Sequence, residues 1–135
     1  MNFSFIKNLS EFKILYNYCK DAEDLVYQKP NLSGISCRNA LEYVLKLVYK
    51  LALPDLDIPS TTYDMMVKQE FIDLFDDSNF MDCLHYVRKM GNAAAHGDNF
   101  NVQDALDTLE YTQYVVGYVL QSLDIVDEYP EYEAP

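Results

Sequence analysis

The chain has 135 residues, of which 50% are hydrophobic and 24% are charged. This size and composition fit one folded domain with a buried core and exclude a disordered tail. Acidic residues outnumber basic residues by 22 to 10, which gives a formal net charge of −12 at pH 7. Lys89 is the last basic residue, so we expect the surface formed by the segment from Met90 to Pro135 to repel nucleic-acid phosphates.

Features of membrane and secreted proteins are missing from the sequence. There is no uncharged apolar run of about 18 residues, and the opening lacks a basic stretch followed by an apolar one. The cysteines, Cys19, Cys37 and Cys83, are odd in number, widely spaced and without a Cys-x-x-Cys pair. We therefore expect buried, reduced thiols in a cytoplasmic protein, with no metal site, no cofactor and no membrane contact.

Two long helices are predicted in the first half of the chain. Asn8 and Glu11 have capping-box spacing, which predicts a helix from Asn8 until the break at Pro30. A second helix is predicted from about Leu32 to Ala52, with Asn31 as its N-cap. Its predicted apolar face consists of Ile35, Leu41, Val44, Leu45, Val48 and Leu51.

The middle connection begins with a loop between two prolines and is predicted to contain short helices. Thr61 or Thr62 would cap the first of them, and a further helical turn is predicted from Glu70 to Phe75. Ser78 or Asn79 would open the next long helix.

That long helix is predicted to end at Gly97, a residue favoured just beyond helix ends. Asn101 and Asp104 again have capping-box spacing and predict the start of the last helix. We therefore predict an all-α fold, an antiparallel four-helix up-and-down bundle with one or two extra short helices. Residues 1–127 would form this single domain, and residues 128–135 have the composition of a linker toward further domains.

The segment from His85 to Gly97 carries the residues that could perform chemistry. At about 100° per residue, His85, Arg88, Asn92 and His96 fall on one helical stripe at the edge of the core. In a ribonuclease-like or ligand site, Arg88 would stabilise phosphate charge and a histidine would transfer protons. Alternatively, the stripe satisfies polar groups at the bundle edge, and chemistry alone favours this structural interpretation because such stripes are common.

Two further groups of side chains have structural interpretations. Arg38 lies near the apolar face of the second helix, and Glu42, four residues later, is its local candidate partner. Tyr111, Tyr114 and Tyr118 form a stripe on the last helix that would be either an interface, as in a homodimer, or a second layer of the core.

The motif from Arg88 to Gly97, RKMGNAAAHG, resembles the R-K-x-G-N-x-A-x-H-G signature of a helical family. That family occurs at the N-termini of type I restriction R subunits and related DEAD/DEAH-type helicases, and is described as a domain of unknown function. Further matching segments are Asn2–Ile6, Ala22-Glu23, Pro30, Cys37–Glu42 and Asp104–Leu106. The resemblance covers nearly the whole chain in order.

The family looks related to the HEPN superfamily of helical bundles. Active HEPN ribonucleases carry an Arg, a polar residue, three more residues and then His. In this sequence Asn92 and His96 match that pattern, but Gly91 stands at the Arg position and the nearest arginine is Arg88, one turn earlier. This departure argues against ribonuclease activity.

The resemblance implies a non-catalytic assembly or recognition domain of a type I restriction R subunit. Cleavage and ATP-driven translocation would then lie in later domains of a type I site-specific deoxyribonuclease polypeptide. The expected partners are those domains and other subunits of the restriction complex, with little direct nucleic-acid binding. One alternative is a HEPN-type ribonuclease or toxin-like enzyme that uses Arg88, Asn92 and His96 and dimerises to pair two sites. Another is a small-ligand or nucleotide sensor built on the same stripe.

Overall fold

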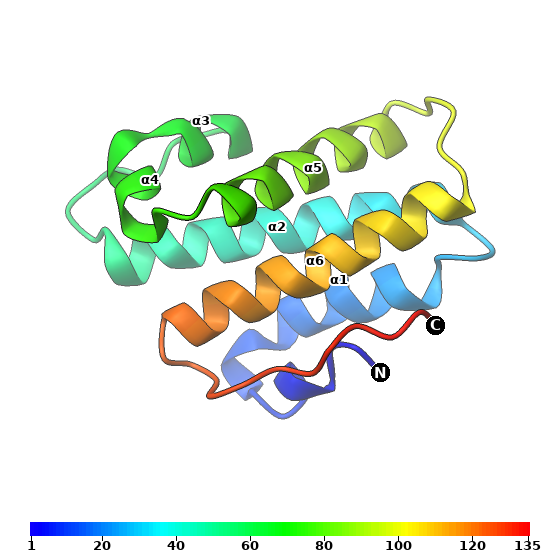
Figure 1. Ribbon diagram of the computed structural model, residues 1–135, viewed down its shortest axis with the longest axis horizontal. Coiled ribbons are helices and arrows are strands. Elements are labelled where there is room, and N and C mark those ends of the chain that lie inside the picture. Colours follow the sequence, from blue (N-terminus) through cyan, green and yellow to red (C-terminus); the bar gives the residue numbers. More distant parts are fainter.

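The computed structural model describes residues 1–135 and contains six α-helices, two 3₁₀ turns and no strand (Figure 1). The α-helices are α1 (Lys13–Asp24), α2 (Pro30–Ala52), α3 (Thr62–Val67), α4 (Gln69–Phe75), α5 (Ser78–Ala95) and α6 (Val102–Ser122). The 3₁₀ turns are η1 (Ser4–Ile6) and η2 (Ser10–Phe12). The all-helical class predicted from the sequence is confirmed. No helix combines the length and the apolar character that a membrane span requires.

Helix α2 lies at the centre and contacts α1, α5 and α6. In Figure 1 these four longer helices lie side by side, and successive ones run in opposite directions. The short helix α3 packs against α2, α4 and α5. One continuous core of buried hydrophobic residues joins all six helices and also takes in Phe3 and Ile6 from the N-terminal arm. Because α2 is held on three sides, side chains at its edges have fixed positions.

The first helix begins later than predicted. Helix α1 starts at Lys13, and Asn8 is exposed and caps nothing, so the predicted capping box is wrong. The preceding residues form the tight turns η1 and η2, which bury Ile6 and Phe12 in the core. Burial of these apolar side chains outweighs the local capping signal. The helix also ends earlier than predicted, at Asp24.

Helix α2 begins at Pro30, two residues before the predicted start. Proline is favoured at the first helical position because its missing N–H would have no helical partner there. Asn31 therefore does not cap the helix; its side-chain amide donates to the Ala94 carbonyl of α5 at 3.1 Å. At the other end, Leu51 was predicted on the apolar face but is 56% exposed, because the face drifts away from the core in the last turn.

The remaining helix ends lie at or beside the predicted residues. Thr61 accepts the Asp64 N–H and caps α3, and Asn101 and Asp104 form a complete capping box on α6. Gly97, with φ of 71°, follows α5 in the left-handed conformation that glycine tolerates best. Helix α5 is capped by Asp77, one residue before the predicted position, through a 3.0 Å bond from the Phe80 N–H.

The C-terminal segment, residues 128–135, runs back along the helices and ends near the N-terminus (Figure 1). The Tyr129 ring lies against Gly117 of α6, and Gln113 donates to the Pro130 carbonyl at 2.6 Å. The Glu133 N–H donates to Asn2 Oδ1 at 2.8 Å. These contacts hold the segment on the domain, and its predicted role as a linker stays a prediction.

Tyrosines of α6 mostly extend the core. Tyr118 stacks on Phe80 with ring centroids 4.2 Å apart and donates its hydroxyl to Asp77 at 2.9 Å. Tyr114 packs against Tyr118, whereas Tyr111 is 40% exposed and packs against a tyrosine of α5. Tyr114 and Tyr118 therefore form a second layer of the core, which is one of the two interpretations that the sequence allowed.

All three cysteines are buried and free. Burial raises the pKa of the Cys37 thiol to about 12, and it also raises the pKa of the Cys19 thiol. These thiols stay protonated at neutral pH and behave as small core side chains.

Candidate functional site

Two glycines bring α2 and α5 into close contact. A Cβ atom on Gly91 of α5 would lie 2.6 Å from the Cβ atom of Arg38 on α2. One turn away along the same contact, a Cβ atom on Gly34 would lie 2.6 Å from that of Ala94. Real Cβ atoms never come this close, so glycine at these positions permits the approach. The Arg38 side chain consequently leaves α2 directly against α5.

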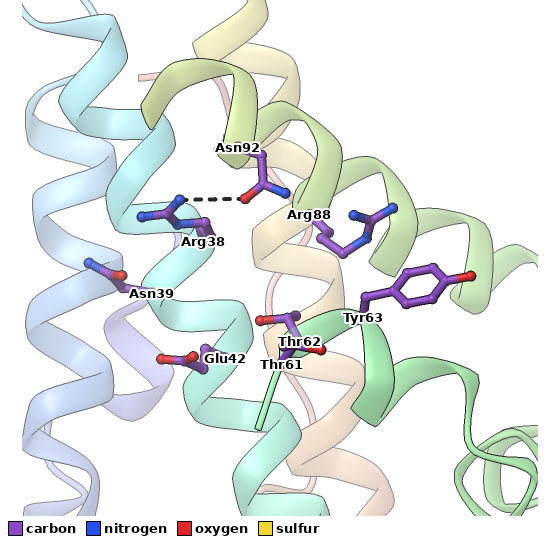
Figure 2. Close-up of a pocket in the computed structure, with 8 residues that line it drawn as sticks. All are labelled: Arg38, Asn39, Glu42, Thr61, Thr62, Tyr63, Arg88 and Asn92. Atoms are coloured by element: carbon purple, nitrogen blue, oxygen red, sulfur yellow. Dashed lines mark hydrogen bonds between the residues drawn. The ribbon is translucent and has the colours of Figure 1, made fainter. Parts of the chain in front are cut away.

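A cleft of about 340 Å³ lies beside this contact, between α2, α5 and the start of α3 (Figure 2). Its lining is strongly polar and includes both arginines of the chain. The lining residues are Arg38, Asn39, Glu42, Thr61, Thr62, Tyr63, Arg88 and Asn92. Three separate elements that are distant in sequence therefore line the cleft.

Neither arginine of the cleft is neutralised by a carboxylate. Arg38 Nη1 donates to Asn92 Oδ1 at 3.4 Å, a long hydrogen bond that Figure 2 shows as a dashed line. The Arg88 guanidinium lies over the Tyr63 ring, 5.0 Å from its centroid, in a cation–π contact. Arg88 Nε is buried and donates to no acceptor in the protein. The ion pairs of the chain involve lysines only.

The predicted pairing of Arg38 with Glu42 does not form. The Glu42 carboxylate instead lies 3.8 Å from the ammonium group of Lys46, one turn further along α2. Arg38 is turned toward α5 by the close helix contact, which carries its guanidinium to Asn92. Both Arg38 and Glu42 nevertheless line the same cleft.

The two histidines lie apart from this cleft. His96 is exposed at the C-terminal end of α5, and His85 lines a different depression together with Asp77 and Asp82. His85 and His96 are eleven positions apart, which is roughly 16 Å along a helix, so the ends of the predicted stripe are too distant for one site. Of that stripe, only Arg88 and Asn92 reach the cleft.

Burial lowers the pKa of His85, and the nearby positive charges of Arg88 and Lys89 lower it further. A lowered pKa keeps the imidazole neutral at pH 7, so His85 adds no positive charge beside the arginine cleft.

Comparison with known proteins identifies a family but no relative of known function. A family model described as a domain of unknown function (DUF4145) matches residues 20–131, which is most of the chain. The chain belongs to this family. No curated protein and no solved structure matches it. Every residue that lines the cleft lies within the part matched by DUF4145.

Sequence reasoning missed Asn39 and the part of the cleft that α3 contributes. Asn39 directly follows Arg38 and could have been found from that neighbour. Thr62 and Tyr63 come from a six-residue helix whose packing against α5 has no local sequence signal. Thr61 was predicted only as a helix cap, and its hydroxyl group also lines the cleft.

Most of the side chains that line the cleft can donate hydrogen bonds. Two arginines, two asparagines and two threonines line the cleft together with a single acidic residue, Glu42. Guanidinium groups bind phosphate and carboxylate oxygens through parallel hydrogen bonds. No group of three or more histidine, cysteine or acidic side chains is placed to hold a metal ion. The arrangement is suited to binding an anionic group.

Proposed function

We propose that this chain is a non-catalytic recognition and assembly domain of a type I restriction R subunit or a related helicase polypeptide. In this proposal, DNA cleavage and ATP-driven translocation belong to other domains of a type I site-specific deoxyribonuclease. The partners are those domains and the other subunits of the restriction complex. We also propose that its four long helices form a HEPN-like up-and-down bundle.

The arginine cleft is the observation that carries the recognition role. A buried donor without a protein acceptor is uncommon, and Arg88, which lines the cleft, has such a donor in its Nε. General acid–base catalysis needs a titratable group within hydrogen-bond reach of the reacting atom. Glu42 is the one acidic residue that lines the cleft, and no histidine lines it. The cleft therefore lacks a second titratable group that could act as a partner to Glu42. This composition favours binding over proton transfer.

A HEPN-type ribonuclease is the alternative, in which Arg88, Asn92 and His96 would act together. The exposed position of His96, outside the cleft that holds the other two, counts against a site within one chain. The alternative would need a second copy of the chain to bring its own His96 to this cleft.

A cleavage assay separates the two functions. We expect purified protein to leave fluorescent single-stranded RNA intact in the presence of a metal chelator, and the His96→Ala protein to behave identically. Melting curves of both proteins serve as the folding control. Cleavage by the wild-type protein that disappears in a folded His96→Ala protein would establish the ribonuclease alternative.

The proposed restriction setting has its own test. An antibody against this domain should precipitate a large polypeptide that contains helicase motifs, together with the other subunits of a restriction complex. The same precipitation with antibody pre-absorbed on purified domain controls for nonspecific capture. Recovery of the domain on a polypeptide without helicase motifs would contradict this part of the proposal.

A further inference from the structure

We propose that the arginine cleft binds a nucleoside 5′-monophosphate, with the phosphate against Arg38 and Arg88 and the base beside Tyr63. This inference rests on the proposed recognition function and names the ligand that the cleft selects.

Both guanidinium groups have unused donors. Each carries five N–H donors, and Arg38 uses one of them in a 3.4 Å bond to Asn92. The Arg88 side chain makes no hydrogen bond within the protein, and because its Nε is buried, the N–H groups of its two Nη atoms are the donors available to a ligand. Two such groups at one cleft match the three oxygens and the roughly −2 charge of a phosphate monoester.

The remaining lining fits a ligand that is more than a bare anion. The Glu42 carboxylate would repel phosphate if it stood beside it, but it can accept hydrogen bonds from ribose hydroxyls. Asn39 and Asn92 carry amide groups that donate and accept, as the edges of nucleic-acid bases require. An inorganic anion would make no use of the Glu42 carboxylate or of the amide oxygens.

Tyr63 supplies a flat surface at the cleft. Its side chain belongs to a residue that is 49% exposed, although Arg88 covers part of one face. Figure 2 shows the ring beside the Arg88 guanidinium, with Thr61 and Thr62 at the start of the same helix on the side toward α2. Stacking of a base on an aromatic side chain contributes about 1–3 kcal/mol in single-stranded nucleic-acid complexes. The same contact would hold the base of a mononucleotide.

Size and charge favour a small ligand over a nucleic-acid chain. The cleft volume of about 340 Å³ lies near the lower end of the range for small-molecule sites. The whole chain carries a net charge of −12 and has no basic residue after Lys89, so a long polyanion would meet repulsion along its length. A mononucleotide places its whole charge at the two arginines.

Calorimetric titration of the whole chain tests the inference, with adenosine 5′-monophosphate, inorganic phosphate and adenosine as separate probes. We expect a dissociation constant on the order of 10–100 µM for the nucleotide. Binding of inorganic phosphate and of adenosine should each be weaker by about tenfold or more. Arg88→Gln should weaken nucleotide binding by about tenfold or more. Lys89→Gln removes the same charge from the adjacent, exposed position and should change binding by less than about twofold.

Two further variants keep the test decisive if Arg88→Gln does not fold. Arg38→Lys keeps the charge but loses the forked donors and should weaken nucleotide binding. Tyr63→Ala changes a half-exposed side chain and should weaken binding of the nucleotide while leaving that of inorganic phosphate unchanged.

Specific outcomes would overturn the nucleotide inference. These are equal affinity for nucleotide and inorganic phosphate, no saturation by about 1 mM nucleotide, or equal loss of binding in the Lys89→Gln control. A glutamate-rich peptide that binds and loses affinity in Arg88→Gln would identify a protein occupant and leave the recognition function standing. RNA cleavage, in contrast, would refute the non-catalytic function whether or not the nucleotide binds.

Discussion

Gly91 and Arg38 lie in direct contact across the α2–α5 interface, and any side chain in place of the glycine hydrogen would force the two helices to shift. A Cβ atom at position 91 would lie 2.6 Å from Arg38 Cβ and 3.3 Å from the Gly34 carbonyl oxygen. The neighbouring helix packs Arg38 against this glycine, so the position of Arg38 depends on the absence of a side chain at position 91.

We expect Gly91→Ala to destabilise the fold and weaken ligand binding in the cleft. Overpacking of this kind costs about 1–3 kcal/mol, whereas alanine gains about 1 kcal/mol over glycine inside a helix. The neighbour is a Cβ atom fixed to the α2 backbone, so relief requires the helices to move apart. Urea unfolding should therefore show a net loss of stability of up to about 2 kcal/mol.

Gly117→Ala is the matched control, because Gly117 also lies within a helix and its added Cβ would meet the Tyr129 ring. That ring belongs to the C-terminal segment, which can shift without separating two helices. We expect little change in unfolding free energy and faster proteolysis after Asp127. A Gly91→Ala protein as stable as wild type would show that the helix contact tolerates the methyl group.

Asn2 joins the two ends of the described chain, and its replacement by Ala should free the C-terminal segment. Its side chain donates to Glu23 Oε1 and to the Glu133 carbonyl, each at 2.8 Å, and accepts the Glu133 N–H. Glu23 is only 8% exposed, so losing a donor leaves a buried carboxylate poorly satisfied. Chemical denaturation should show a loss of about 1–2 kcal/mol.

Asn8→Ala is the control for this prediction, since Asn8 is exposed and makes no capping bond. Its effect should stay within about 0.5 kcal/mol. A loss near 1 kcal/mol, the usual effect of removing an N-cap, would mean that the capping box predicted from the sequence forms in solution.

Duplex DNA should bind this domain weakly. Nine acidic and no basic residues occur after Lys89, and the two arginines lie within a cleft rather than on a broad surface. Fluorescence anisotropy at ~150 mM salt should show no saturation below about 10 µM protein. A salt series provides the control, because any residual binding should fall as salt rises. Sub-micromolar affinity at the same salt would contradict the expectation.

Local signals in the sequence predicted most of the helices because they depend on a few neighbouring residues. The capping box of Asn101 and Asp104, the Thr61 cap and the glycine after α5 all formed where their patterns indicated. The same capping pattern failed at Asn8 because it competes with burial of apolar residues in the N-terminal arm. Such competition depends on tertiary packing, which a local pattern does not contain.

The candidate site was predicted only in part for a related reason. Helical periodicity correctly associated Arg88 with Asn92, since both lie on one helix. It also associated His85 and His96, because periodicity gives a face but not the extent of the cleft along it. Arg38 reaches the cleft because α2 and α5 are in tight contact, and Tyr63 reaches it because α3 packs against α5. Neither position could be predicted from the spacing of residues within one helix.

His85 provides the pH prediction. Burial, then Arg88 and then Lys89 lower the pKa of its imidazole below the ordinary value of about 6.5, against a smaller opposing effect of Asp82. NMR titration should place its midpoint below that value, with the His96→Ala variant assigning which of the two histidines is observed. Arg88→Gln should raise the midpoint without restoring it fully, because burial is the larger cause.

The lowered pKa of His85 also fixes the direction of its effect on stability. Above about pH 6.5 the imidazole is neutral in both the folded and the unfolded chain, so its titration does not change the free energy of unfolding there. As pH falls below this value the unfolded chain takes up the proton first, which favours unfolding, and the effect is complete below the lowered folded pKa. Urea midpoints at pH 7.5 and 5 should therefore differ less in His85→Gln than in wild type. An equal or larger difference in the variant would show that His85 does not contribute to the acid sensitivity of the fold.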